Sequence, residues 1–204
     1  QLRTNKIVDD ALIEAFLSVP RELFVEPNHQ AIAYADIDVS TGNGRKLMAP
    51  MVIAQLIQVV QAQPNEIALH IGCATGYSSA ILAKLVGTVV SLESDKDLAA
   101  RANDNFTNLA VDNAVVVEGT LNEGYANQGP YDIICIEGAV AEIPSRLTVQ
   151  LADGGRLCAV VDDGNGPGKA VLLVKKGSTV SERVLFDATI TSLPGFEAEK
   201  GFVF

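Results

Sequence analysis

The stretch LHIGCATGYSS, residues 69–79, decides the fold, because a short apolar run ends there in a series of small residues. Gly72 and Gly76 enclose Cys73, Ala74 and Thr75. Small residues at the end of a strand either let the backbone turn tightly or let a ligand approach it closely. In open α/β sheets, ligands bind at the carboxyl ends of the strands, where such turns lie. The question is which group approaches this turn.

Outward from this turn, short apolar runs alternate with helical patterns. The runs predict strands at residues 67–71, 88–93, 114–119, 131–138 and 155–161, and the patterns between them predict helices at 78–86, 96–109 and 143–151. Continuous β-branched runs separated by helices indicate a parallel sheet that is covered on both faces. Two later runs, 169–176 and 183–190, are expected to pair antiparallel across the turn at Gly177 and Ser178.

The first third of the chain has a different character. Helical patterns cover residues 9–19 and 50–62, and residues 27–49 between them look irregular. With 204 residues, the chain has the length of one ordinary domain. We therefore expect a single α/β domain over residues 1–204. Its parts are a helical extension with a substrate-side loop at 1–62, a sheet core at 67–161 and C-terminal antiparallel strands at 169–204.

Composition and charge exclude several classes of partner. The formal net charge is −10, which argues against nucleic acid and against an anionic membrane surface, because phosphates require Lys and Arg for neutralisation. The three cysteines, Cys73, Cys135 and Cys158, are far apart and odd in number, which favours a reducing cytoplasm over a disulfide framework. We expect no metal site, no signal peptide and no membrane span, since none of these patterns is present.

The glycine turn itself distinguishes two kinds of nucleotide ligand. A dinucleotide fingerprint needs a third glycine, but Tyr77 follows Gly76, which disfavours a nicotinamide oxidoreductase. The spacing G-x-A-x-G at Gly72, Ala74 and Gly76 resembles the first motif of class I S-adenosylmethionine methyltransferases. Glu93 ends the second strand 21 residues after Gly72 (93 − 72), where an acid can accept hydrogen bonds from both ribose hydroxyls. Alternatively, the glycines only pack a tight turn and the acid is a helix cap or a solvated charge.

A resemblance along nearly the whole chain points to one family. It rests on LSVPRELFVEP, AYADIDVSTGNGRKLMAPMVIAQLIQ and GAVAEIPSRLTVQLADGGRL, at residues 17–27, 33–58 and 138–157, together with the glycine turn. In this order they resemble the protein-L-isoaspartate O-methyltransferase family. The resemblance implies a Rossmann-like class I methyltransferase fold, with a mostly parallel twisted sheet and helices on both faces. It also implies a cytoplasmic protein-repair enzyme that transfers a methyl group from S-adenosylmethionine to the free carboxyl of isoaspartyl residues in damaged proteins and peptides.

The same resemblance implies two groups of site residues. Lys46 and Met48 occupy the positions at which the family has the Thr and Ser that orient the substrate carboxylate. The expected donor-binding residues surround the carboxyl ends of the strands, and they are Gly72, Cys73, Ala74, Gly76, Tyr77, Glu93, Gly119, Thr120 and Glu137. No metal takes part in the expected chemistry.

Several of these positions depart from the family pattern. The family's Gln-Thr-Ile-Ser reads Arg45, Lys46, Leu47 and Met48 in this chain, so both hydroxyls are missing. Met48 cannot donate a hydrogen bond. The cation of Lys46 either binds a carboxylate strongly or points into solvent.

Four further departures lie in the same expected pocket. His70 replaces an acid before the first glycine, Ala74 replaces the middle glycine, Thr120 replaces the Asp of Gly-Asp-Gly and Glu137 replaces a Thr. A His on an apolar strand is more often a hydrogen-bonded core residue than a catalyst. Glu137 either compensates for the lost acids or pairs with Lys46.

Together these changes add an alternative to the main hypothesis. The main hypothesis is an active isoaspartyl methyltransferase. The alternative is a diverged protein of the same fold with weak or no isoaspartyl activity, which acts on another carboxylate or serves as an interaction module. The missing hydroxyls predict that the protein methylates isoaspartyl peptides slowly or not at all.

Overall fold

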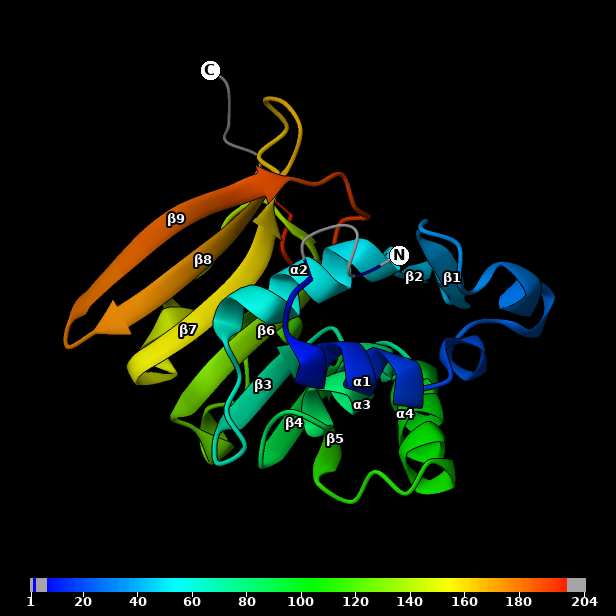
Figure 1. Cartoon of the computed structure of the whole chain (residues 1–204). Coiled ribbons are helices and arrows are strands. Elements are labelled where there is room, and N and C mark those ends of the chain that lie inside the picture. The colour runs from blue at the N-terminus through cyan, green and yellow to red at the C-terminus, as the bar shows by residue number, and fades with distance from the viewer. Residues whose placement is uncertain (1, 3–6, 198–204) are drawn as a thin grey trace.

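A computed structural model describes residue 2 and residues 7–197, and a seven-stranded sheet forms its centre (Figure 1). The strand order is β5-β4-β3-β6-β7-β8-β9. The strands are β3 (Ile67–Ile71), β4 (Thr88–Glu93), β5 (Ala114–Glu118), β6 (Tyr131–Val140), β7 (Leu151–Val161), β8 (Lys169–Lys176) and β9 (Thr179–Asp187). The first five are parallel, while β8 and β9 continue the sheet antiparallel. The predicted parallel core and C-terminal pair are confirmed, although β9 begins and ends earlier than the expected 183–190.

The strand order reverses next to β3. From β3 the chain proceeds outward through β4 to β5, and it then returns to place β6 on the other side of β3. The carboxyl ends of β3 and β6 therefore flank the point at which a ligand crevice is expected in an open α/β sheet. The glycine turn lies at this point, directly after β3.

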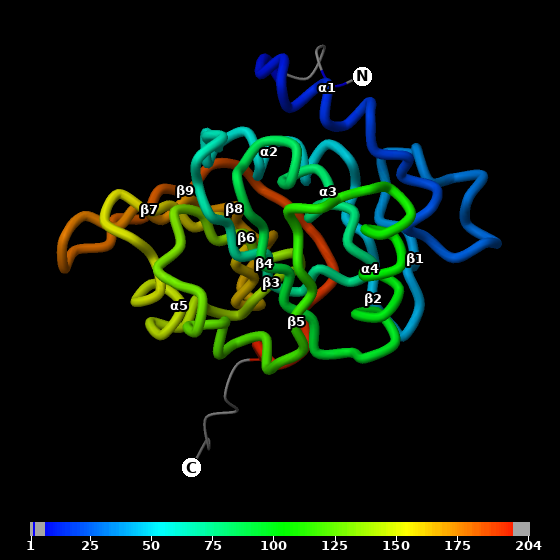
Figure 2. Tube along the Cα trace, turned by 90° about the horizontal axis from the view of Figure 1, so that it is seen from below, coloured from blue at the N-terminus to red at the C-terminus, as the bar shows by residue number. Residues whose placement is uncertain are grey.

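The two faces of the sheet are covered unequally. The helices are α1 (Asp10–Ser18), α2 (Pro50–Val60), α3 (Tyr77–Ala83), α4 (Lys96–Asn108) and α5 (Ser145–Val149). The first three lie on one side of the sheet in Figure 2, and α4 adds Phe106 to the same apolar cluster. The opposite face is covered by the short α5, by Leu121 of the 3₁₀ segment η4 (Leu121–Glu123) and by Leu193 and Phe196 from an irregular segment. Helices on both faces were expected, but on this face most of the cover is not helical.

Local sequence explains where the longer helices begin. The carboxylate of Asp9 accepts a hydrogen bond from the Leu12 amide, which caps α1. The carboxylate of Asp95 accepts from the amides of Asp97 and Leu98 at the start of α4. The hydrogen bond from the Leu98 amide is the largest contribution that holds the pKa of Asp95 below its ordinary value. Helix α2 ends at Val60, where the backbone leaves the helix through Gln61, which has φ of +50°.

The sequence suggested that residues 27–49 are irregular, but the structure has regular elements there. They include the 3₁₀ segment η3 (Pro27–Ile32) and a hairpin of β1 (Val39–Gly42) and β2 (Arg45–Leu47). Along β2, Arg45 and Leu47 are buried and Lys46 is exposed. This alternation follows from the two-residue period of a strand, and it turns Arg45 toward the sheet.

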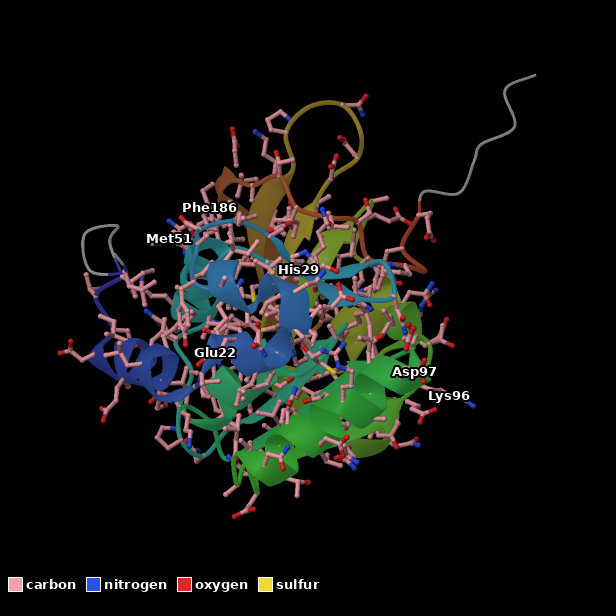
Figure 3. All side chains as sticks on the ribbon, turned by 90° about the vertical axis from the view of Figure 1, so that its right-hand side faces the viewer. Glu22, His29, Met51, Lys96, Asp97 and Phe186 are labelled. Carbon is pink, nitrogen blue, oxygen red and sulfur yellow. The ribbon has the colours of Figure 1, made fainter. Side chains whose placement is uncertain are left out.

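The hairpin is attached to the beginning of α4. The Asn43 side-chain amide donates to both carboxylate oxygens of Asp95 at 3.1 and 3.0 Å, and Arg101 donates to the Thr41 carbonyl at 2.5 Å. Figure 3 looks onto this side of the molecule, with Lys96 and Asp97 marking the start of α4. These bonds hold the hairpin beside the carboxyl ends of the strands. Within the described part of the chain, no helix is both long and apolar enough to cross a membrane.

Arg156 on β7 ties the sheet to the end of α2. Its guanidinium donates to the Val60 carbonyl at 2.9 and 2.6 Å and to Glu66 at 2.7 Å. Burial by itself raises the pKa of Glu66, but hydrogen bonds from Arg156 and from the Gln63 amide outweigh it. The pKa of Glu66 therefore lies below its ordinary value.

Replacing Arg156 should weaken the fold. We expect Arg156→Ala to lower the free energy of unfolding at pH 7 by about 2–4 kcal/mol, because two carbonyl contacts and a partly buried carboxylate lose their partner. Urea denaturation measures this change. Arg183→Ala, on the exposed face of β9, serves as the matched control and should change stability little.

The same pair of variants gives a pH dependence. Because the folded pKa of Glu66 is depressed, its contribution is present above the unfolded pKa of about 4.3 and is lost as the pH falls through the folded value. The stability difference between the parent protein and Arg156→Ala should shrink on acidification. A difference that grows at low pH, or an equal loss in Arg183→Ala, would contradict this account.

Candidate functional site

The glycine turn is tight, and each glycine in it has a different neighbour. Gly72 and Gly76 have φ of +78° and +94°, in the region that favours glycine. A Cβ on Gly76 would lie 2.7 Å from the ring of Phe106, so this glycine allows α4 to pack against α3. A Cβ on Gly72 would lie 2.7 Å from Cδ1 of Leu193 and 3.0 Å from Nη2 of Arg45. The groups that approach Gly72 closely are therefore side chains of the chain itself.

Glu93 lies at the end of β4 and is completely buried. Its carboxylate accepts hydrogen bonds from the amides of Ala74 at 2.8 Å, Ser94 at 2.8 Å and Asp95 at 3.1 Å. Nη1 of Arg45 lies 2.9 and 3.1 Å from the two carboxylate oxygens. Every side of the carboxylate is thus occupied by a donor from the protein.

Arg45 is anchored on two sides. Besides its bonds to Glu93, it donates from Nη2 to the Gly72 carbonyl at 2.8 Å, and its side chain is only 8% exposed. Charge-assisted bonds of this kind are among the stronger ones in proteins, and this pair is shielded from water. The ion pair therefore joins β2, the glycine turn and the end of β4.

A C-terminal segment closes the site from the other side. The Leu193 amide donates to the Ala139 carbonyl at 2.7 Å, and the Ala139 amide donates to the Thr191 carbonyl at 3.0 Å. These bonds hold Leu193 over Gly72 and over Gly138, where a Cβ would lie 2.8 Å from that of the leucine. Leu193 is 2% exposed, so the segment is packed onto the strand ends.

A second buried polar cluster, formed by His70, Ser79 and Glu137, lies beside the Arg45–Glu93 ion pair. Nδ1 of His70 is 2.7 Å from the Ser79 hydroxyl, and Nε2 is 2.9 Å from Oε2 of Glu137. Neither Glu137 oxygen forms a hydrogen bond of good geometry, in spite of that short contact. Of the two roles the sequence left open for Glu137, a pair with Lys46 is wrong, because Glu137 faces His70. The same contacts favour the core interpretation of His70.

Lys46 and Met48 are not equivalent in the structure. Lys46 is exposed and, among the described residues, forms no ion pair, which matches the solvent interpretation. Met48 is buried, and its carbonyl accepts from Nη2 of Arg21 at 2.7 Å. Met48 and Glu137 border the same small cavity.

Three other expected donor-binding residues, Gly119, Thr120 and Tyr77, lie in different surroundings. The Gly119 amide donates to the Glu93 carbonyl at 3.0 Å, while Thr120 is exposed. The ring of Tyr77 faces the N-terminal helices, where its centroid is 5.4 Å from that of Phe24. Burial is the largest cause that raises the pKa of Tyr77 to about 12.

Cys73 is buried in the turn beside the acidic groups. Burial is the largest cause that raises the pKa of its thiol well above the ordinary value, and the carboxylates of Glu93 and Glu137 add to it. A thiol in such surroundings stays protonated and unreactive. Cys73 therefore contributes its small size and its backbone to the turn.

Little space remains at the strand ends. The cavity beside the ion pair measures about 10 Å³ and is lined by Asp38, Arg45, Lys46, Met48, Glu137, Gly138, Thr191, Ser192 and Leu193. The cavity around His70 also measures about 10 Å³. Such a volume holds about one water molecule, whereas pockets for small molecules measure roughly 300–1,000 Å³. In this arrangement, side chains of the chain itself fill both places.

A larger cavity, of about 380 Å³, lies elsewhere. It is bordered by α1, by the start of α2 and by Tyr34 and Tyr77, and most of its lining is apolar. It does not include any of the groups that surround Glu93. The predicted nucleoside site and this larger cavity are therefore different places.

Sequence reasoning missed the two residues that fill the site. Arg45 was noted only as a replacement for a family Gln, because the hairpin was not predicted and its inward direction was unknown. Leu193 follows the last predicted strand, and its return to the strand ends depends on backbone bonds that leave no residue pattern. The Asn43-Gly44 turn ahead of Arg45 was the one available signal for the hairpin.

Comparisons with known proteins agree on one family. A family model described as Protein-L-isoaspartate(D-aspartate) O-methyltransferase matches residues 1–191. A protein-L-isoaspartate O-methyltransferase of Methanoculleus marisnigri is 37% identical over 175 residues, which are 86% of this chain and 78% of that protein. One from Methanoregula boonei is 36% identical over 182 residues, 89% of this chain and 83% of that protein.

Solved structures show the same fold. A protein-L-isoaspartate O-methyltransferase superposes with a TM-score of 0.85 at 25% identity, over 96% of this chain and 64% of that longer chain. A structure described as a putative protein-L-isoaspartate O-methyltransferase from Plasmodium falciparum, in complex with S-adenosyl-L-homocysteine, has a TM-score of 0.79 at 24% identity. It covers 95% of both chains, and the likeness to it concerns the fold.

The two partners of the buried ion pair should differ in their effect on stability. We expect Glu93→Ala to lower the free energy of unfolding by about 3–5 kcal/mol, because it leaves the Arg45 guanidinium buried without its counter-ion. Arg45→Ala should cost less, since Glu93 keeps three backbone N–H donors. Urea denaturation of both variants measures the difference, and a larger loss in Arg45→Ala would refute the assignment.

Proposed function

The chain belongs to the protein-L-isoaspartate O-methyltransferase family, and on that basis we propose that it methylates the free carboxyl of isoaspartyl residues in damaged proteins and peptides, with S-adenosylmethionine as the donor. The family match over residues 1–191 is the observation that carries this proposal. The turn at Gly72 and the acid at Glu93 support it, because they stand at the strand ends where the strand order reverses. A cytoplasmic location is part of the proposal, and the three free, buried cysteines suit a reducing compartment.

The reaction class asks little covalent chemistry of the protein. A substrate carboxylate is itself a nucleophile, so the protein has to orient it and to keep water away. The hairpin β1–β2 and the segment that carries Leu193 cover the strand ends and are suited to exclude water. In the arrangement described, however, they also exclude the donor, so the site has to open before any turnover.

One observation favours a second function. Two buried acid–base pairs, Arg45 with Glu93 and His70 with Glu137, fill the place where donor and substrate would meet. A protein that kept the fold for binding a partner, without methyl transfer, would need no open site. The second candidate is therefore an interaction module with weak or no isoaspartyl activity.

An activity assay separates the two candidates. The protein is incubated with S-adenosylmethionine and an isoaspartyl peptide, and the methanol released from the ester is measured. The first candidate predicts slow but saturable release that depends on the isoaspartyl linkage, with a matched aspartyl peptide as the blank. Release equal to the blank at every peptide concentration favours the interaction module.

Restoring the family residues on the hairpin should raise the rate. We expect Arg45→Gln with Lys46→Thr and Met48→Ser to methylate the peptide about 10²–10³ times faster, which corresponds to roughly 2.7–4 kcal/mol for a preorganised donor. The double change Lys46→Thr with Met48→Ser separates the hydroxyl effect from that of Arg45. If the parent protein already matches a relative that carries both hydroxyls, the departures are harmless and the explanation fails.

A further inference from the structure

We propose that Arg45 and Leu193 act together as an internal stopper of the donor site, so that S-adenosylmethionine binds only after an ion pair within the chain has been displaced. The identity of the donor rests on the proposed function. The closure itself rests on contacts of the described residues alone. It makes Arg45 the residue that sets the affinity for the nucleoside.

Several donors compete for the carboxylate of Glu93. A carboxylate offers about four acceptor positions. Three backbone amides, the Ser94 hydroxyl and Nη1 of Arg45 already occupy them. A ribose hydroxyl therefore gains an acceptor only by replacing one of these donors. The amides belong to the turn and to the start of α4, and the Ser94 hydroxyl makes only one long contact of 3.3 Å. Arg45, which contacts both carboxylate oxygens, is therefore the donor whose departure frees most of the carboxylate without unfolding that backbone.

Arg45 and Leu193 also fill the volume beside Gly72. The backbone of this glycine is bare, as a closely approaching ligand requires, yet Arg45 and Leu193 press on the position of its missing Cβ. The Arg45 guanidinium also donates to the Gly72 carbonyl. One group thus blocks both the ribose acceptor and the backbone surface beside it. Leu193 occupies the remainder and leaves a cavity of about 10 Å³.

The stopper can open while the sheet stays intact. Leu193 and Phe196 are buried, but the residues between and beside them are exposed, and the segment is held by a few backbone bonds to Ala139 and Ala141. Segments with so few contacts open at lower free energy than the core. Arg45 sits on a three-residue strand at the end of a hairpin. Both parts belong to elements that can move separately from the parallel strands.

Only open molecules bind the donor. The apparent affinity is therefore the intrinsic affinity multiplied by the fraction of molecules that are open. If about one molecule in a hundred is open, the dissociation constant for the donor rises about 100-fold over its intrinsic value. Removing Arg45 and trimming Leu193 should each recover part of this factor. The recovery is measured with S-adenosylhomocysteine, which reports binding and needs no turnover.

The test is isothermal calorimetry of the full chain with S-adenosylhomocysteine. Four proteins are compared: the parent, Arg45→Gln, Arg45→Gln with Leu193→Ala, and the surface control Arg183→Gln. We expect the parent and the control to bind equally weakly, Arg45→Gln to bind about tenfold more tightly or better, and the double variant to bind more tightly again. Thermal unfolding with and without the nucleoside shows that each variant is folded.

Several outcomes overturn the proposal. Binding by the parent as tight as that of Arg45→Gln shows that the ion pair does not compete with the nucleoside. No gain in the folded double variant shows that the site lacks the nucleoside surface altogether. If a variant does not fold, the parent protein alone tests the proposal. Tight binding of the nucleoside by the parent contradicts a closed site. Weak binding by the parent, with no rise in its unfolding temperature when the nucleoside is added, supports a closed site.

Failure of the proposed function looks different. A variant that binds S-adenosylhomocysteine tightly and still releases no methanol from the isoaspartyl peptide contradicts the isoaspartyl activity. It leaves the stopper in place as an explanation of weak donor binding. The reverse result, methanol release by a parent that binds the nucleoside tightly, contradicts the stopper and supports the activity.

Discussion

The ion pair between Arg45 and Glu93 is the constraint on which the arrangement of the strand ends depends. It connects a hairpin from the N-terminal third of the chain to the end of a central strand, and through the Gly72 carbonyl to the glycine turn. The pair is held firmly because both partners are buried, and both have further hydrogen bonds. The hairpin, the turn and the start of α4 are positioned relative to one another by this contact together with the bonds of Asn43 and Arg101.

The same ion pair explains which groups approach the glycine turn closely. The small residues after β3 leave the backbone bare, and the groups that come close to it are Arg45 and Leu193. The fold and the family match point to a nucleoside at this place, while the side chains fill it. A buried carboxylate needs a partner, and the inward-facing Arg45 supplies one to Glu93. The second pair, His70 with Glu137, extends this rearrangement toward the expected position of the substrate.

Much of the fold could be predicted, and particular residues show why the rest could not. The strands at 67–71, 88–93 and 169–176 follow continuous apolar runs, and their predicted bounds coincide with those of β3, β4 and β8. The hairpin was missed because β1 and β2 are short and lack an apolar pattern, and their pairing depends on distant contacts with α4. The position of Glu93 could be predicted from its spacing to Gly72. Its partner could not, since Arg45 and Glu93 are 48 residues apart and nothing local couples them.

The central claim is that the guanidinium of Arg45 and the ribose of the donor exclude each other at Glu93. Crystal structures of the parent chain and of Arg45→Gln, both grown with the same concentration of S-adenosylhomocysteine, test it most directly. The account predicts a nucleoside with its ribose on Glu93 in the variant, and Arg45 still on Glu93 without a nucleoside in the parent. A parent structure in which the nucleoside occupies the strand ends while Arg45 and Glu93 remain in contact would contradict it.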